Sequence, residues 1–213
     1  MNARSPSDTK AQSLRSRLKE ATAAAILDAA EELFAEKGLS AAHMNEIAAK
    51  AGVAVGTLYN HFEDRDALLS ALVETRRDEI LEVMDEFLAQ PSSGDFRTDL
   101  TALVQLIGGF FQKHRRFHLI MHRLEWGLHT GNFPATATCA PVMKREMYTR
   151  LDKLIRRGLK QKALRAELAD QYAYLLLGLF RSIRLQQIDE GLDPERPIDV
   201  GAVVRFFMEG AAV

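Results

Sequence analysis

Apolar residues recur every three or four positions along most of the 213-residue chain, which is the spacing of one face of a helix. The alternation of polar and β-branched residues that marks strands is almost absent. Only 6 prolines interrupt the chain, so long stretches contain no helix breaker. The pattern predicts an all-α fold, with helices over about residues 17–37, 44–51, 55–61, 64–89, 96–113, 116–128, 140–161, 167–188 and 199–211.

Breaks in this pattern divide the chain into three parts. Residues 1–16 have no apolar face and an excess of basic side chains, so we expect a flexible basic arm. Residues 17–63 hold three short helical stretches separated by turns that contain glycine. Residues 64–213 form a second, larger helical domain, and its first helix, over 64–89, connects it to the part before it.

The segment over residues 45–69 is the most informative one. Small residues such as Ala48 and Ala51 let two short helices approach closely, and Gly52 permits a sharp turn between them. This arrangement is typical of a helix-turn-helix. The second of these helices, over 55–61, is about 10 Å long at about 1.5 Å per residue, enough to place its first turn in a major groove.

The outward face of this second helix has the chemistry of a DNA-binding surface. Leu58 and Phe62 are expected to point inward, which leaves hydroxyl groups and a ring N–H outward as phosphate donors. An asparagine that reaches a base edge can pair with adenine through two hydrogen bonds. A helical hairpin with a merely polar surface is the alternative. The residues expected at DNA are Asn45, Val55, Gly56, Thr57, Tyr59, Asn60, His61 and Arg65.

An ordered set of apolar residues and glycines runs through this part of the chain. It consists of Ile26, Leu27, Ala29, Ala30, Leu33, Phe34 and Gly38, then Ile47, Ala48, Ala51, Gly52 and Val53, then Gly56, Thr57, Leu58, Tyr59, His61 and Phe62, and finally Leu68 and Leu69. In order and spacing, this set resembles the TetR family of transcriptional regulators. The resemblance says little about residues 95–213.

The resemblance implies a homodimeric, ligand-responsive transcription factor, most often a repressor, that binds a palindromic operator in double-stranded DNA. It places Thr57, Tyr59 and His61 at phosphate-contacting positions and Val55 and Gly56 near the bases. It also implies that the last two helices, over about 167–188 and 199–211, form the dimer interface.

Two positions depart from the family pattern. His43 stands where the family often has a Ser or Thr that caps the helix and touches phosphate. A histidine caps poorly, but its ring could itself approach DNA. Arg65 stands where a lysine is usual, and it keeps the charge with a different geometry.

The second domain is rich in large, adaptable side chains, and the resemblance implies a pocket there for a small, largely apolar effector. Plain core packing explains the same side chains equally well, because every helical domain buries such residues. An arginine on an otherwise apolar helix could bind an acid group of the effector or form an ion pair. The candidate effector-binding residues are Phe110, Phe111, Phe117, Met121, Trp126, Met143, Met147, Tyr172, Phe180 and Arg181.

A stripe of His118, His122 and Glu125 supports an alternative function. Spacings of four and three residues place these side chains along one side of a helix. Two imidazoles one turn apart can bind a transition metal, so the alternative is a helical small-molecule or metal-dependent enzyme. A half-exposed polar flank explains the stripe as well. Because no recognised catalytic motif accompanies it, we expect no enzyme, no cofactor and no bound metal.

The charge balance limits how DNA could be bound. The chain has 28 Lys and Arg against 29 Asp and Glu, and residues 1–65 have 8 against 9. We expect Glu31, Glu32 and Glu36 to face solvent and Lys50 to lie nearer DNA. Few phosphate contacts then predict a modest salt dependence of binding. The longest dense apolar stretch, over 172–180, is far shorter than the roughly 20 residues of a spanning helix, so we expect a soluble, cytoplasmic protein.

Overall fold

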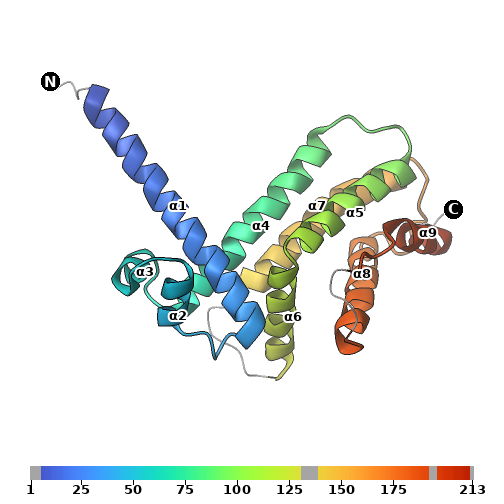
Figure 1. The fold of residues 1–213 in the computed structure, drawn as a ribbon. Coiled ribbons are helices and arrows are strands. Elements are labelled where there is room, and N and C mark those ends of the chain that lie inside the picture. Colours follow the sequence, from blue (N-terminus) through green and yellow to red (C-terminus); the bar gives the residue numbers. More distant parts are fainter. Residues whose placement is uncertain (1–5, 131–138, 192–195, 212–213) are drawn as a thin grey trace. The chain divides into compact units, whose positions relative to one another are not determined.

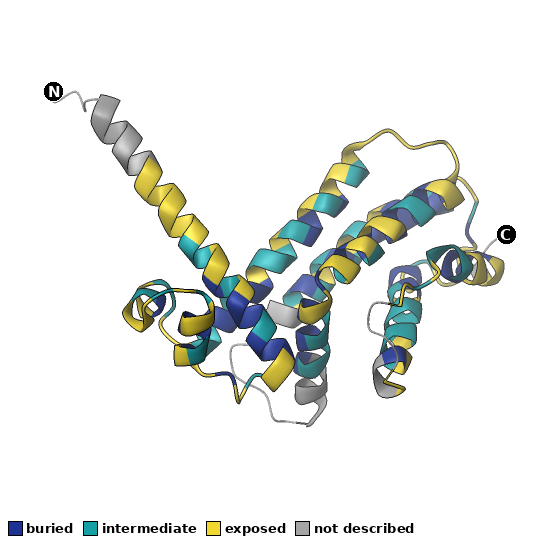
Figure 2. Cartoon of the chain, in the orientation of Figure 1, coloured by how far each residue is buried: buried dark blue, intermediate teal, exposed yellow. Residues whose placement is uncertain are grey.

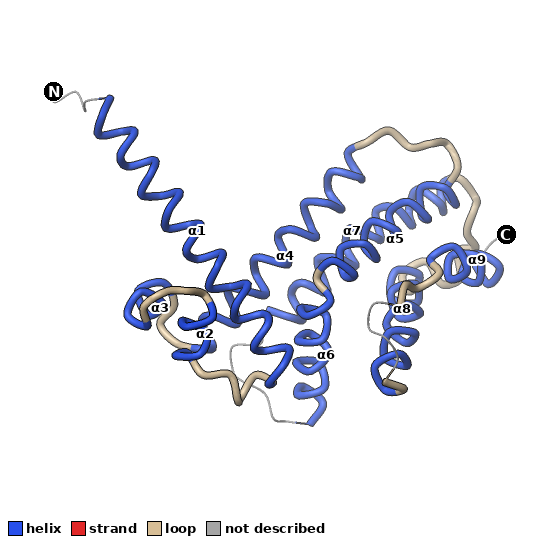
Figure 3. The backbone as a smooth tube through the Cα atoms, in the orientation of Figure 1, coloured by secondary structure: helices blue, strands red, loops and turns tan. Residues whose placement is uncertain are grey.

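The computed structural model describes residues 6–130, 139–191 and 196–211, and every regular element in those ranges is a helix (Figures 1 and 3). The all-α prediction is therefore confirmed. No helix within those ranges is long and apolar enough to cross a membrane. The helices are α1 (Pro6–Lys37), α2 (Met44–Lys50), α3 (Val55–His61), α4 (Arg65–Ala89), α5 (Phe96–Lys113), α6 (Arg115–Thr130), α7 (Cys139–Lys160), α8 (Tyr172–Asp189) and α9 (Val200–Ala211).

The chain divides into two compact units. The head unit consists of Met1–Val73 and Leu119–Ala137, and the second unit consists of Glu74–His118 and Thr138–Val213. This division differs from the predicted boundary after residue 63, because the first turns of α4 and the later part of α6 cluster with the head. Both α4 and α6 thus contribute residues to both units.

The first helix is longer than the sequence pattern predicts. It begins at Pro6, so residues 6–16 are helical and not a flexible arm. Proline is suited to the first turn of a helix, because its missing N–H has no partner there anyway. Side-chain bonds support the turns that follow: Ser16 donates to Glu20 at 2.8 Å, and the Thr22 hydroxyl donates to the carbonyl of Leu18 at 2.8 Å.

The head unit is built on the later part of α1. Ile26 and Phe34 of α1, Ile47 of α2 and Leu58 of α3 are fully buried. One guanidinium nitrogen of Arg123, on α6, donates to the carbonyls of Phe34 at 2.9 Å and Ala35 at 2.8 Å. A cation at the carbonyl end of α1 is also favoured by the helix dipole. These contacts fix the end of α1 against α6.

Two ion pairs fix α2 against α1. Lys37 binds Glu46 at 2.7 Å, and Lys50 binds Glu32 at 2.6 Å. Lys50, which was expected to lie nearer DNA, has its ammonium group held by a carboxylate of the neighbouring helix. Glu31 was expected to face solvent but is buried, with 7% of its surface exposed, whereas Glu36 is exposed.

In the second unit, α5 packs against α9 and α7, and α8 packs against α7 and α9. The core of this unit is apolar and fully buried at positions that include Leu100, Leu103, Leu151 and Leu176. Asp95 caps α5 by accepting the Thr98 N–H at 2.9 Å. α8 begins at Tyr172 and not at 167, because turns occupy the chain after Lys160.

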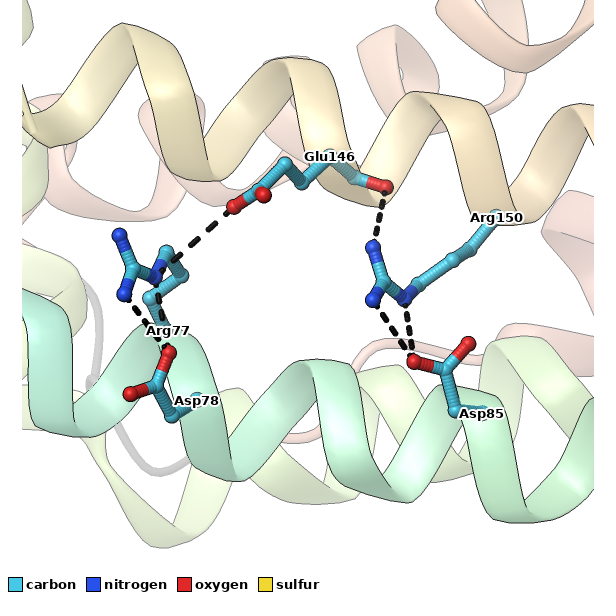
Figure 4. Close-up of polar contacts among 5 residues, drawn as sticks. All are labelled: Arg77, Asp78, Asp85, Glu146 and Arg150. Atoms are coloured by element: carbon cyan, nitrogen blue, oxygen red, sulfur yellow. Dashed lines mark hydrogen bonds and ion pairs between the residues drawn. The ribbon is translucent and has the colours of Figure 1, made fainter.

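Polar contacts connect α4 to α7 inside the second unit (Figure 4). Arg150 donates to one carboxylate oxygen of Asp85 at 2.9 and 2.7 Å. Arg77 lies between Asp78, at 2.8 Å, and Glu146, at 3.8 Å. Residue 77 of α4 faces residue 146 of α7, and residue 85 faces residue 150, so these two helices run in the same direction.

Candidate nucleic-acid interface

The start of α2 is fixed by residues on both sides of it. His43 precedes the helix in an extended conformation, with φ −94° and ψ 143°. One Glu46 oxygen accepts the backbone N–H of His43 at 3.5 Å, and the other accepts Lys37 at 2.7 Å. Two hydrogen bonds lower the pKa of Glu46, and the one from the Lys37 side chain has a larger effect than the one from the His43 backbone. The His43 ring itself is exposed at the edge of the head.

The turn between α2 and α3 depends on the backbone of Gly52. Its φ is +69°, and a Cβ placed there would meet no atom within 4 Å, so the backbone angle alone calls for glycine. The N–H of Gly52 binds the Ala49 carbonyl at 3.2 Å, and the N–H of Val53 binds the Ala48 carbonyl at 3.0 Å. These bonds satisfy carbonyls at the end of α2 and aim the chain into α3.

The short helix α3 buries one side and exposes the other. Leu58 is completely buried, while Val55 is 39% and Tyr59 is 49% exposed. Phe62, which was also expected to point inward, is only half-buried. Of the remaining residues expected at DNA, Gly56 and Asn60 are exposed, whereas Thr57 and His61 are half-buried. The outward face of α3 therefore carries the predicted mixture of donors, acceptors and a bare backbone.

An open hollow of about 510 Å³ lies on the head where the starts of α2 and α4 meet α3. It brings together four of the residues that the sequence predicts at DNA: His43, Asn45, Tyr59 and Arg65. The other five, Val55, Gly56, Thr57, Asn60 and His61, are not part of its lining, although all belong to α3. The lining is completed by Ala42, Met44, Asp64 and Asp66.

Arg65 also forms contacts within the head that the sequence did not indicate. One of its terminal nitrogens donates to the carbonyl of Ser40 at 2.9 Å, and its Nε lies 3.9 Å from Asp66. This contact ties the loop before α2 to the beginning of α4. A guanidinium group has five N–H donors, so a phosphate can still be bound by those that remain.

Two acidic residues of the hollow were missed by the sequence reasoning. Asp64 accepts the backbone N–H of Ala67 at 2.7 Å and so caps α4. An aspartate at the first position of a predicted helix is the signal that would have identified this role. Asp66 lies beside Arg65 and moderates its charge.

The residues proposed for an effector are mostly buried, but they do not form one set. Phe117, Met143, Met147 and Tyr172 are buried in the second unit, where Tyr172 meets Phe207 edge to face. Phe110 is buried beside half-buried Phe111, and Phe180 and Arg181 are half-buried on α8. Met121 is buried in the head unit. Trp126 belongs to the same unit, and its side chain lies outside the described residues.

The histidine stripe on α6 is described only in its first part. His118 and His122 are half-buried, and the ring of His118 lies edge-on to Phe111 at 5.3 Å. The side chain of Glu125 lies outside the described residues. Where side chains are described, no group of three or more His, Cys, Asp or Glu could hold a metal ion.

Comparisons with known proteins agree with this geometry. Residues 26–72 match the family model described as bacterial regulatory proteins, tetR family. The HTH-type transcriptional regulator AcrR of Shigella flexneri is 26% identical over 155 residues, or 71% of each chain. The HTH-type transcriptional repressor KstR2 of Rhodococcus jostii is 37% identical over 79 residues, which are 37% of this chain and 38% of that one.

A solved structure extends the likeness in fold to most of the chain. The fatty acid degradation regulator FadR from Bacillus halodurans superposes with a TM-score of 0.69 at 19% identity, over 87% of this chain and 95% of that one. The matched segment 26–72 covers the later part of α1, both short helices and the start of α4. Through this helix-turn-helix segment, the chain is similar to the tetR family of bacterial regulatory proteins.

Proposed function

We propose that the protein is a transcriptional repressor that binds a palindromic operator in duplex DNA as a homodimer. The observation that carries this proposal is the hollow that joins His43, Asn45, Tyr59 and Arg65 beside the exposed face of α3. These side chains offer two cationic or ring N–H groups, an amide and a hydroxyl on one surface. Such donors suit phosphates and base edges. A protein of this function would act in the cytoplasm, where bacterial DNA lies.

The first turn of α3 would enter the major groove. A Cβ added at Gly56 would meet no atom of the protein within 4 Å, so the bare backbone leaves this space open to the DNA. Thr57, Tyr59 and His61 would hold phosphates on either side of the groove. Two heads of a dimer would then read half-sites about 34–36 Å apart.

The last two helices leave several large apolar side chains exposed. On α8, Tyr174 is 55% and Leu175 is 45% exposed, and on α9 Phe206 is 67% exposed. Large apolar side chains that a single chain leaves uncovered are a common mark of an interface. We propose that α8 and α9 of two copies cover these residues mutually.

A small, largely apolar effector would release the DNA. The name of the B. halodurans relative connects that protein with fatty acid degradation, and buried Phe117, Met143 and Met147 offer apolar surroundings of the kind that an acyl chain needs. A ligand that favours one conformation shifts the population toward it. α4 is one continuous helix with residues in both units, so it is an element along which this shift would reach the head.

In vitro selection from a random duplex library with the full-length protein tests the proposal. We expect one enriched sequence with two inverted half-sites. Tyr59→Phe and His61→Ala should then each weaken binding to that duplex about fivefold, since one lost hydrogen bond is worth about 1 kcal/mol. Tyr148→Phe, at a half-buried tyrosine of α7 in the second unit, is the matched control and should bind normally. No enrichment, or no effect of both head variants, would contradict the proposal.

A further inference from the structure

The early part of α1 projects from the head without packing on it. All residues from 14 to 21 are exposed, and Leu14 and Leu18 are 60% and 59% exposed (Figure 2). These residues, with the four that follow, are called the projecting turns (14–25). They are rich in Ala, Leu, Arg and Lys, which are strong helix formers, so a helix is favoured here even without a core beneath it.

The projecting turns carry an excess of positive charge, whereas the helix-turn-helix that follows carries an excess of negative charge. Residues 21–65, which hold the helix-turn-helix, carry 3 Lys and Arg against 7 Asp and Glu, a net charge of −4. Such a surface is repelled by a polyanion unless cations elsewhere compensate. Residues 14–20 carry Arg15, Arg17 and Lys19 against Glu20, a net charge of +2.

The three cations of residues 21–65 are engaged within the head. Lys37 and Lys50 form ion pairs at 2.7 and 2.6 Å, and Arg65 donates to the Ser40 carbonyl at 2.9 Å. Arg15 and Lys19, by contrast, are exposed and form no ion pair with any residue that the structure describes. The projecting turns therefore carry exposed cations that can bind an external anion.

The direction of α2 shows on which side these cations lie. The ion pairs join residue 46 to 37 and residue 50 to 32, so α2 runs antiparallel to α1 and leads toward its N-terminal end. The turn at Gly52 and α3 follow in that direction, and Figure 1 shows α1 projecting past them. The projecting turns thus extend toward the side of the head where α3 lies.

The helical register places two of the three cations of residues 14–20 on the inner face of α1. At about 100° per residue, Arg15 and Lys19 lie within about 20° of the line of Ile26, whose side chain is buried against the head. Arg17 lies about 180° away, on the outer side. Arg15 and Lys19 therefore continue the inner face of α1 beyond the core, one turn apart.

We infer that the projecting turns of α1 form a second contact with duplex DNA, in which Arg15 and Lys19 bind the sugar–phosphate backbone beside the site of α3. This inference rests on the proposed function. It assigns the electrostatic part of binding to α1 and the reading of sequence to α3. It also explains how a helix-turn-helix with a net charge of −4 could hold a polyanion.

Fluorescence anisotropy with the selected duplex tests the inference on the full-length protein. Arg15→Gln with Lys19→Gln should lower affinity about tenfold in 100 mM salt and make the slope of log K against log salt shallower by roughly 2, since each phosphate contact contributes about 0.9. Arg145→Gln with Lys153→Gln is the matched control. It removes one Arg and one Lys from exposed positions of α7 that form no ion pair with described residues, and we expect an unchanged slope.

The outcomes separate the two proposals. If the α1 variant binds like the wild type, or the α7 variant loses as much, the inference is wrong, while weaker binding by Tyr59→Phe still supports the proposed function. If the wild type selects no duplex, the proposed function itself fails. If DNA binding is unchanged but Leu14→Gln with Leu18→Gln lowers self-association, the projecting turns contact a second copy and not DNA.

Discussion

Gly52 and Gly56, four residues apart in the helix-turn-helix, answer different physical demands. Gly52 has a φ of +69°, which L side chains rarely adopt, and open space around it. Gly56 lies within α3 in an ordinary helical conformation, also with open space around it. The first glycine therefore serves the fold, and the second leaves room for a ligand.

Substitution by alanine should separate these two roles. Gly52→Ala is expected to lower the free energy of unfolding by about 1 kcal/mol, because the side chain strains the turn. Gly56→Ala should leave stability unchanged or raise it by up to about 1 kcal/mol, since alanine favours helices, yet weaken duplex binding. Urea denaturation and anisotropy on both variants check this. Equal stability losses would show that Gly56 is structural as well.

Asp99 is a buried carboxylate that holds the connection before α5. It accepts the Ser92 hydroxyl at 2.6 Å and the Ser93 N–H at 3.0 Å. Burial by itself raises the pKa of Asp99, but the hydrogen bonds from Ser92 and Ser93 outweigh it, so the pKa lies below its ordinary value. A lowered pKa stabilises the fold above the unfolded pKa, and this contribution is lost as the pH falls through the folded pKa.

Asp99→Asn should therefore destabilise the protein in a pH-dependent way. At pH 7 we expect a loss of about 1.5–3 kcal/mol, the value of hydrogen bonds to a charged group. The gap between wild type and variant should close as the pH falls below about 4, where an unfolded aspartate takes up its proton. Urea denaturation between pH 3 and 7 measures the gap. A constant gap would mean that the charge of Asp99 is irrelevant.

At the scale of elements, the short helices were predicted well and two helix ends were not. α2 and α3 have bounds within a residue of the prediction, because Gly52 and the apolar spacing are local signals. α1 starts eleven residues earlier than predicted. Its first turns have no apolar face, so the apolar spacing used for the prediction gives no signal there. α8 starts five residues late, because turns occupy residues 167–171 before the helix begins.

α7 and α5 are in contact at a point where only glycine fits. A Cβ on Gly158 would lie 2.6–2.8 Å from ring atoms of Phe96, which is 2% exposed and cannot move away freely. We expect Gly158→Ala to lower the free energy of unfolding by about 1–3 kcal/mol, the usual cost of overpacking. Gly109→Ala, at an exposed glycine of α5 with open space around it, is the control and should be neutral or stabilising. Thermal unfolding of both variants decides whether the contact is rigid.

At the scale of the whole molecule, the second unit leaves large apolar side chains uncovered. Tyr174 and Leu175 on α8 and Phe206 on α9 are all more than 40% exposed. The proposed dimer would cover them, and it would also set the distance between two DNA-reading heads. Stability and DNA binding would then depend on protein concentration.

Phe206→Glu should weaken self-association, because a carboxylate would have to be buried in an apolar interface. Leu106→Glu is the matched control, since Leu106 is also a large exposed apolar residue, 42% exposed, on α5. Light scattering after size-exclusion chromatography is expected to show a monomer for the first variant at concentrations where the wild type and the control are dimers. A dimer of the Phe206 variant would place the interface elsewhere.

The sequence by itself determined the all-α class and the helix-turn-helix, because both depend on residues within a few turns of each other. Tertiary structure alone decided which charges are engaged. Lys50 binds Glu32 and Arg65 binds the Ser40 carbonyl, and each partner comes from a segment that packing brings close. The burial of Glu31 has the same origin. Periodicity records which face of a helix is apolar, but not which neighbour meets it, and that neighbour decides whether a cation remains for DNA.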